Sequence, residues 1–302
     1  MKIAYLISVY KDPKQLKRLI KRLFDNDYFF FIHVDKNIDI APFYKALDDF
    51  KNVCFTNTRF KVSWGGWSQF LYQKELLKSA LSTHLDFNRI FIISGQDYPI
   101  KSNKYIKKEL EDNPNRIYMR AMDYSAPTVS KHNQQDYRVY HFFRDISIDS
   151  RFIKRALIWA SRNIMEILPI RKKRLPNIYG PHTHVYKASG YMGLTLECAK
   201  YVLQELESNK GLIHFFKYSF VPEEFVIPTI IYNSKYKQYA QIVKGNYKGL
   251  KYLSGLTYFN YGTEIQVFKD KDYSELKSTD CLFARKFETG VSDKLMDRLD
   301  KE

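Results

Sequence analysis

The chain has 302 residues, of which 45% are hydrophobic and 27% charged, and this composition excludes an intrinsically disordered protein. Its three cysteines (Cys54, Cys198 and Cys281) lie far apart and form no CxxC pair, which excludes a disulfide framework and favours a reducing compartment. The formal net charge of +16 indicates an anionic partner, such as a nucleic acid, an anionic membrane surface or a phosphorylated substrate.

The first third of the chain alternates between apolar strands and amphipathic helices. Its opening run KIAYLISVY is too short for a membrane span and lacks a cleavage site, so we interpret it as the first strand. The next predicted elements are a helix at 12–24, a strand at 28–35, a helix at 41–50, a strand at 52–56, a loop and long helix within 63–83, and a strand at 89–95. This alternation predicts an α/β fold: a Rossmann-like, mostly parallel sheet with helices on both faces.

Two of the predicted strands end in an acidic residue. Asp35 follows the strand in FIHVDKN, and Asp97 follows the strand in ISGQDYPI. Ligands of parallel α/β sheets bind beyond the carboxyl ends of the strands. We therefore expect both carboxylates at one edge of the sheet, facing one crevice.

The rest of the chain is less regular. Residues 151–174 mix apolar and basic side chains, which is typical either of a helix at a membrane interface or of a core helix with a charged face. Further helices are predicted at 195–207, 223–233 and 291–302. No repeat, low-complexity tract or flexible linker interrupts the sequence, so we predict one continuous domain over 1–302.

Five stretches stand out in chain order: FIHVDKN, VSWGGWS, ISGQDYPI, PEEFVIPTI and LFARKFE. Together they resemble glycosyltransferase family 14, which contains core-2/I-branching β-1,6-N-acetylglucosaminyltransferases and peptide xylosyltransferases. The resemblance implies a GT-A-like fold that transfers a sugar from a UDP-sugar with inversion and without a metal ion. We expect a nucleotide-binding half at 1–120 and an acceptor-binding and catalytic half at 121–302.

The sequence also departs from the vertebrate members of that family. Those members carry a membrane anchor and disulfides, so this chain is more similar to a bacterial relative, and we expect a cytoplasmic protein. N-acetylglucosamine is the expected donor sugar, a glycan hydroxyl the expected acceptor and bacterial surface polysaccharide synthesis the expected role, with a xylosyl- or other hexosyltransferase as the alternative.

A pair of acidic residues in PEEF is the predicted centre of catalysis. An inverting transfer needs a base for the incoming hydroxyl. The resemblance places the general base at Glu224, with Glu223 beside it on the acceptor side. Adjacent carboxylates raise one another's pKa, which suits a base that works near neutrality. The alternative is structural, because Pro222 and two acids are also typical of the first turn of a helix.

Two cations in LFARKFE are predicted to hold the diphosphate of the donor. Lys286 matches the family's phosphate-binding lysine, and Arg285 is expected to replace an upstream arginine whose place is taken by Thr263. The alternative is a solvated surface pair. Because SGQD offers one carboxylate instead of a DxD motif, we expect no metal, and Asp97 and Tyr98 are left to bind donor hydroxyls.

The remaining site predictions concern the walls of the pocket. Asp35 is expected on the uridine side, Gly65 and Gly66 are expected to allow close approach of the nucleotide, and Trp64 or Trp67 to form a wall; a Gly-Gly turn before a helix is also a common structural element. The predicted donor-binding residues are Asp35, Trp64, Gly65, Gly66, Asp97, Tyr98, Arg285 and Lys286. The predicted acceptor-binding residues are Arg138, Tyr140, His141 and Glu223.

The expected partners are a UDP-sugar, an oligosaccharide or lipid-linked glycan acceptor, and an anionic membrane on the inner face through residues 151–174. Two other functions are open: a basic nucleic-acid-binding protein and a metal-dependent GT-A transferase. Basic residues are spread over most of the chain and no nucleic-acid-binding motif is present, so we predict no nucleic-acid partner. The DxD at Asp270 and Asp272 follows no apolar strand, and His182 and His184 lack a clear third ligand.

Overall fold

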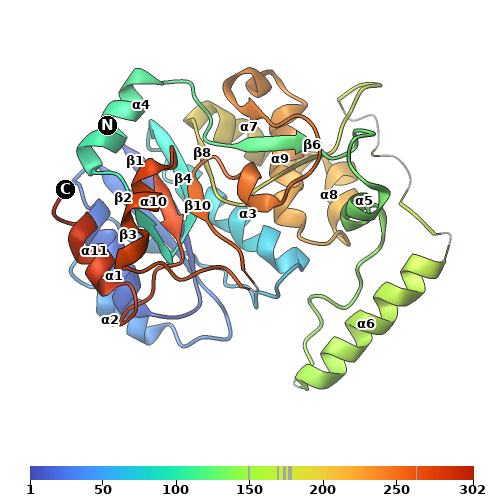
Figure 1. Ribbon diagram of the computed structural model, residues 1–302, viewed down its shortest axis with the longest axis horizontal. Coiled ribbons are helices and arrows are strands. Elements are labelled where there is room, and N and C mark those ends of the chain that lie inside the picture. Colours follow the sequence, from blue (N-terminus) through green and yellow to red (C-terminus); the bar gives the residue numbers. More distant parts are fainter. Residues whose placement is uncertain (149, 169, 173–174, 176–178, 263) are drawn as a thin grey trace.

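A five-stranded sheet in the order β3-β2-β1-β4-β8 forms the centre of the computed structural model, which describes all residues except 149, 169, 173–174, 176–178 and 263 (Figure 1). Its strands are β1 (Ile3–Val9), β2 (Tyr28–Val34), β3 (Val53–Phe55), β4 (Arg89–Ser94) and β8 (Met192–Leu194). The first four are parallel, and β8 pairs antiparallel with β4. The mostly parallel α/β sheet predicted from the sequence is confirmed.

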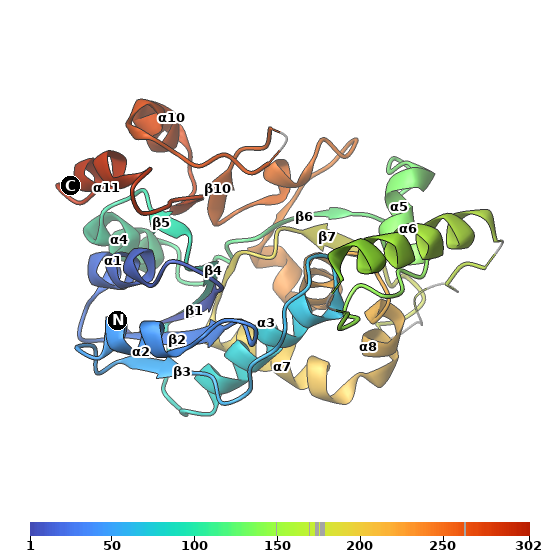
Figure 2. The same cartoon turned by 90° about the horizontal axis from the view of Figure 1, so that it is seen from below.

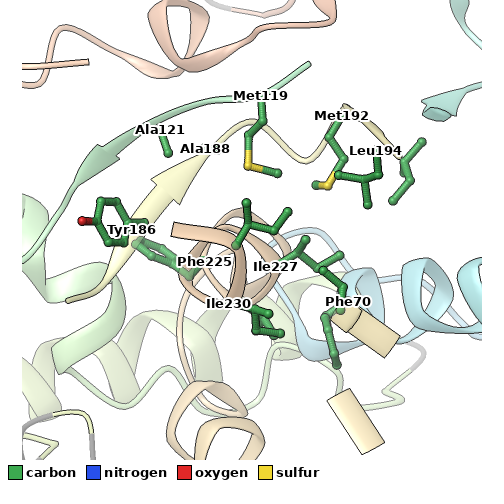
Figure 3. Close-up of a cluster of buried hydrophobic side chains, with 14 of the residues drawn as sticks. Phe70, Met119, Ala121, Tyr186, Ala188, Met192, Leu194, Phe225, Ile227 and Ile230 are labelled. Carbon is green, nitrogen blue, oxygen red and sulfur yellow. The ribbon is translucent and has the colours of Figure 1, made fainter. Parts of the chain in front are cut away.

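Side chains alternate between the two faces of this sheet, and each face has its own core. Along β1, Ala4 and Leu6 belong to one buried cluster, whereas Tyr5 and Ile7 belong to the other. Helices cover both faces, as predicted. The first cluster includes residues of α3 (Trp67–Leu81), α7 (Leu196–Ser208), α8 (Lys210–Phe216) and α9 (Val226–Tyr232), and Figure 3 shows part of it. The second includes residues of α1 (Pro13–Leu23), α2 (Ala41–Leu47), α4 (Asn103–Asp112), α10 (Tyr273–Ser278) and α11 (Asp293–Leu299).

Two small sheets extend the centre. One has the order β10-β11-β5, formed by β10 (Thr257–Phe259), β11 (Phe283–Arg285) and β5 (Asp97–Pro99). The other has the order β7-β6-β9, formed by β7 (Tyr186–Ala188), β6 (Arg120–Asp123) and β9 (Gln241–Ile242). Because β11 pairs with β5, the last part of the chain returns to the N-terminal half.

The helix predicted at 223–233 is two elements. A 3-10 helix, η1 (Pro222–Glu224), begins at the proline, and α9 follows after Phe225. The backbone changes direction before this segment, because Val221 has a φ of 45°. The two glutamates therefore lie on a short turn of helix that packs against α3, not on the buried helix α9 itself.

Helix α6 (Arg151–Ile167) lies at the edge of the molecule, on the same side as α5 (Lys131–Arg138) (Figures 1 and 2). Ser161 is the one buried residue of this helix, so the interpretation of the segment as a core helix is wrong. Among the residues that the structure describes, no helix has both the length and the apolar character needed to cross a bilayer.

Candidate active site

A cleft of about 560 Å³ opens where β1, β2 and β4 end. Ser8, His33 and Ser94 line it at the carboxyl ends of these strands. This is the edge at which parallel α/β sheets bind their ligands. Of the predicted site residues, the cleft brings together Asp35, Trp64, Glu223, Glu224, Arg285 and Lys286.

The carboxylates of Glu223 and Glu224 enter the cleft from η1 and are both withdrawn from water. Burial raises the pKa of Glu224 to about 7 against the opposing charge of Lys187, whose Nζ lies 3.4 Å from Oε2. Burial and the charge of Glu224 raise the pKa of Glu223 well above its ordinary value. In the described part of the chain, Oε2 of Glu223 has no hydrogen-bond partner. The cleft thus offers one carboxylate held by a cation and a second whose Oε2 accepts no hydrogen bond from the described residues.

Lys187 on β7 is a buried cation that the sequence analysis missed. Its Nζ lies 2.7 Å from Oδ2 of Asp136 on α5, and it is surrounded by the rings of Tyr124, Phe225 and Tyr247, whose centroids are 4.9, 5.0 and 5.5 Å away. Burial lowers the pKa of Lys187, but the charges of Glu224 and Asp136 outweigh burial and the pKa is raised. Lys187 therefore stays protonated and holds Glu224 in place.

Arg285 and Lys286 form a cationic wall of the same cleft. The side chain of Arg285 is nearly buried, with its guanidinium 4.8 Å from the ring centroid of Tyr191. Within the described residues, Nε and Nη1 of Arg285 have no hydrogen-bond partner. Buried unpaired N–H donors are costly, which makes this guanidinium a ready anion site. Thr263 lies outside the described residues.

Asp97 does not line the cleft. The prediction that Asp97 binds donor hydroxyls directly does not fit this position. Strand β5 pairs with β11 so that Asp97 stands opposite Arg285, and the carboxylate is fully buried beneath the guanidinium. Its Oδ1 lies 3.7 Å from Nη1 of Arg285, and its Oδ2 accepts a hydrogen bond of 3.3 Å from Thr257. Burial raises the pKa of Asp97 to about 6, opposed by the charge of Arg285. Asp97 thus positions Arg285.

Tyr98 also lies away from the cleft. Successive residues of a strand point to opposite sides, so Tyr98 faces the core when Asp97 faces Arg285. Its hydroxyl donates to Oδ1 of Asp300 at 2.6 Å, and its ring packs against Phe287 with centroids 5.3 Å apart. The prediction that Tyr98 contacts the donor does not fit this position.

The two glycines of VSWGGWS make room for protein side chains at the start of helix α3 and do not border an open nucleotide site. Gly65 has a φ of 71°, and an added Cβ would collide with the ring of Phe220. At Gly66 an added Cβ would collide with the carboxylate of Asp145, which caps α3 by accepting a hydrogen bond of 2.6 Å from the backbone N–H of Trp67. The predicted approach of the nucleotide is thus occupied by protein at both glycines. Trp64 does line the cleft and is 71% exposed.

Asp35 lines the cleft at the end of β2, and its carboxylate shapes the local backbone. Oδ1 accepts from the backbone N–H of Asn37 at 2.8 Å, and Oδ2 accepts from that of Val62 at 3.1 Å. The same carboxylate that was predicted to face the uridine therefore fixes the two loops that border this end of the cleft.

Three of the predicted acceptor residues lie outside the cleft. Arg138 ends α5 and donates to Gln134, and the ring of Tyr140 stacks on Phe142. His141 is withdrawn from solvent, which lowers its pKa to about 4, and it lines a second pocket of about 430 Å³. That pocket also contains Gly66. Glu223 is the predicted acceptor residue that the cleft does contain.

Lys187 and Asp136, which support Glu224 without lining the cleft, carried little signal in the sequence. A lysine in the short apolar run VYKASGYMGL was a usable sign, because a strand lysine is rarely buried without an acidic partner. Asp136 lies in a polar helix and gave no such sign. The residues that do line the cleft and were not predicted include Tyr10, Tyr72, Gln73, Tyr191 and Tyr261.

The rival motifs do not form a metal site among the described residues, where no group of three or more His, Cys, Asp or Glu side chains is placed to hold an ion. Asp272 accepts a hydrogen bond of 2.8 Å from the backbone N–H of Lys269 and so caps a helical turn, and Asp270 lies near Arg298. His184 pairs with Asp123, with 2.7 Å between Nδ1 and Oδ2.

A carboxylate pair and a cationic wall facing one cleft are typical of α/β proteins that bind a phosphorylated ligand at the carboxyl edge of the sheet. The family model that describes the Core-2/I-Branching enzymes matches residues 3–242. The chain belongs to the Core-2/I-Branching enzyme family.

The curated relatives that the chain matches include xylosyltransferases. Xylosyltransferase oxt of Drosophila melanogaster is 22% identical over 318 residues, which cover 100% of this chain and 33% of the relative. Xylosyltransferase 2 of Rattus norvegicus is 25% identical over 315 residues, which cover 99% and 33%. The chain thus spans about a third of the length of these relatives. Among solved structures, the chain is similar to a 4-diphosphocytidyl-2C-methyl-D-erythritolsynthase from Anaerococcus prevotii, with 11% identity and a TM-score of 0.39. The match covers 92% of this chain and 95% of that chain.

Proposed function

We propose that the chain is an inverting glycosyltransferase that moves a sugar from a UDP-sugar to a hydroxyl group of a glycan acceptor. The observation that carries this proposal is the cleft itself, in which two carboxylates and two cations meet in a member of the Core-2/I-Branching enzyme family. An inverting transfer needs a base on the acceptor side and positive charge at the departing diphosphate. The cleft contains both kinds of group.

Glu224 is the proposed base. It takes the proton of the acceptor hydroxyl while that oxygen forms a bond to the anomeric carbon and the bond from that carbon to the diphosphate oxygen breaks. A pKa raised to about 7 suits this role, because an effective general base has a pKa near the pH at which it works. Glu223, whose pKa burial raises well above its ordinary value, is the proposed hydrogen-bond partner of the acceptor.

Arg285 and Lys286 are the proposed partners of the diphosphate. Each places positive charge in a partly enclosed cleft, where charge on the leaving group is stabilised more strongly than in water. Nε and Nη1 of Arg285, which donate no hydrogen bond to the described residues, support this role, and we infer that transfer proceeds without a divalent metal. The donor sugar and a role in bacterial surface polysaccharide synthesis remain predictions; the names of the relatives make xylose as good a candidate as N-acetylglucosamine.

A UDP-release assay tests the function. The purified chain is incubated with UDP-N-acetylglucosamine, UDP-xylose, UDP-galactose or UDP-glucose, each with and without EDTA. We expect turnover of one donor at a rate that EDTA leaves unchanged. Activity that EDTA abolishes and Mn²⁺ restores would instead identify a metal-dependent transferase, and binding of RNA or DNA without binding of UDP would identify a nucleic-acid-binding protein.

Substitution Lys286→Ala is expected to weaken UDP binding by about 10- to 100-fold, because a charge-assisted hydrogen bond to phosphate is lost. Isothermal titration calorimetry measures this affinity directly. Lys271→Ala is the control. It makes the same change at an exposed lysine of the 3-10 helix Asp270–Asp272, and this variant should bind UDP as the unmodified chain does. Equal affinity for both variants would remove Lys286 from the site.

A further inference from the structure

Helix α6 presents large apolar side chains to solvent. Phe152 is 81% exposed, Trp159 69% and Ile167 83%. At 100° per residue, Phe152, Ala156 and Trp159 follow one another along one side of the helix, with Asn163 among them and Ile167 about 60° from Phe152. Large apolar side chains that are exposed together mark surfaces that bind a partner or a membrane.

A row of arginines runs beside this apolar line. Arg151, Arg155 and Arg162 lie on the adjoining face of the helix, and Glu166 is the one acidic side chain in α6, where it pairs with Arg162 at 2.8 Å. An apolar face rich in Trp, Phe and Ile next to a basic face is the pattern of helices that lie in the plane of a membrane interface. The helix has 17 residues and is about 25 Å long, which suits lying on a bilayer.

The opposite side of α6 fixes it to the rest of the protein. Nζ of Lys154 donates to Oγ of Ser63 at 3.0 Å, next to Trp64 at the cleft. At the other end, the guanidinium of Arg171 donates to the carbonyl oxygens of Met165 and Glu166, at 2.9 and 3.0 Å, and so satisfies carbonyls in the last turn. Lys154 thus joins the start of the helix to the loop beside the cleft, on the side of α6 opposite the exposed apolar residues.

We propose that α6 docks the protein on an anionic membrane surface, with Phe152, Trp159 and Ile167 entering the interface and the three arginines meeting lipid phosphates. Charge complementarity favours this occupant over a second copy of the chain, because two copies would bring two rows of arginine together on a protein that already carries a net charge of +16. This inference is independent of the proposed function.

Vesicle flotation tests the proposal. The chain is mixed with vesicles of phosphatidylcholine alone or with about a third phosphatidylglycerol. We expect binding to the anionic vesicles that weakens as salt is added, with much weaker binding to neutral vesicles. The double variant Phe152→Ser, Trp159→Ser should lose about 100-fold in affinity. Arg155→Glu with Arg162→Glu should lose about tenfold or more.

The matched control is Lys107→Glu with Lys108→Glu on α4, an equal change of charge at the other end of the molecule (Figure 1), and it should bind as the unmodified chain does. All the substituted side chains are exposed, and a circular dichroism melt should confirm unchanged folding. Vesicle binding that the α6 variants leave intact would overturn the proposal. So would sedimentation that shows self-association through α6 with no binding to anionic vesicles.

Discussion

Substitution Glu224→Gln is expected to lower kcat by about 10²- to 10⁴-fold, because the amide cannot accept the proton of the acceptor hydroxyl. Glutamine has nearly the same shape as glutamate and keeps one oxygen within reach of Lys187, so binding of UDP should be unchanged. Single-turnover kinetics with the active donor measures the loss, and calorimetry measures the affinity for UDP. Full activity of this variant would show that Glu224 is not the base.

Glu223→Gln is the matched control for that experiment. Glutamine can donate a hydrogen bond as a protonated glutamate does, so we expect a much smaller loss of kcat than at Glu224. The pH profile adds a second readout. Since the pKa of Glu224 is raised to about 7, kcat/KM should fall as the pH drops below 7, where the base becomes protonated, and this fall should vanish in Glu224→Gln. A larger loss at Glu223 would exchange the two assignments.

Substitution Lys187→Met is expected to lower the free energy of unfolding by about 3–5 kcal/mol, the typical cost of removing one partner from a buried ion pair. Methionine fills a similar volume but leaves the carboxylates of Asp136 and Glu224 near one another without a cation. The pKa of Glu224 should then rise above 7, because the charge of Lys187 opposes the effect of burial. Chemical denaturation measures the stability.

The control for Lys187→Met is Lys237→Met. Lys237 is an exposed lysine whose Nζ donates to the hydroxyl of Tyr186, next to Lys187, at 3.2 Å. This change should alter stability by less than about 1 kcal/mol, since exposed polar contacts contribute little. If both variants unfolded at the same denaturant concentration, the ion pairs of Lys187 with Asp136 and Glu224 would have no special role in stability.

Strand and helix periodicity was sufficient to predict the four parallel strands of the central sheet and the edge at which the cleft forms, but not the antiparallel strand β8. The runs ending at Asp35 and Asp97 are apolar on both faces, which is typical of parallel strands covered on both sides. Arg285, Lys286 and the two glutamates line the cleft, as expected from the resemblance of their motifs to the family. What the sequence left open was which way each side chain turns.

The positions of Asp97 and Gly66 show why the direction of each side chain could not be predicted from the sequence. Asp97 lies under Arg285 because a strand of three residues pairs with a distant one, and so short a strand has no periodicity that would reveal its register. Gly66 admits Asp145 from a segment about 80 residues later, a contact that no local pattern contains. Lys187 was missed for the same reason, since its two acidic partners come from other elements.

The pairing of β11 with β5 has a consequence for how the protein assembles. Thr257, which donates to Asp97, is separated from it by 160 residues, so the chain must close a very long loop before the positive wall exists. The parallel strands at the N-terminus can meet earlier, since their contacts are closer in sequence. A nascent chain would therefore possess its carboxyl-edge crevice well before it acquired the charge that an anionic ligand needs.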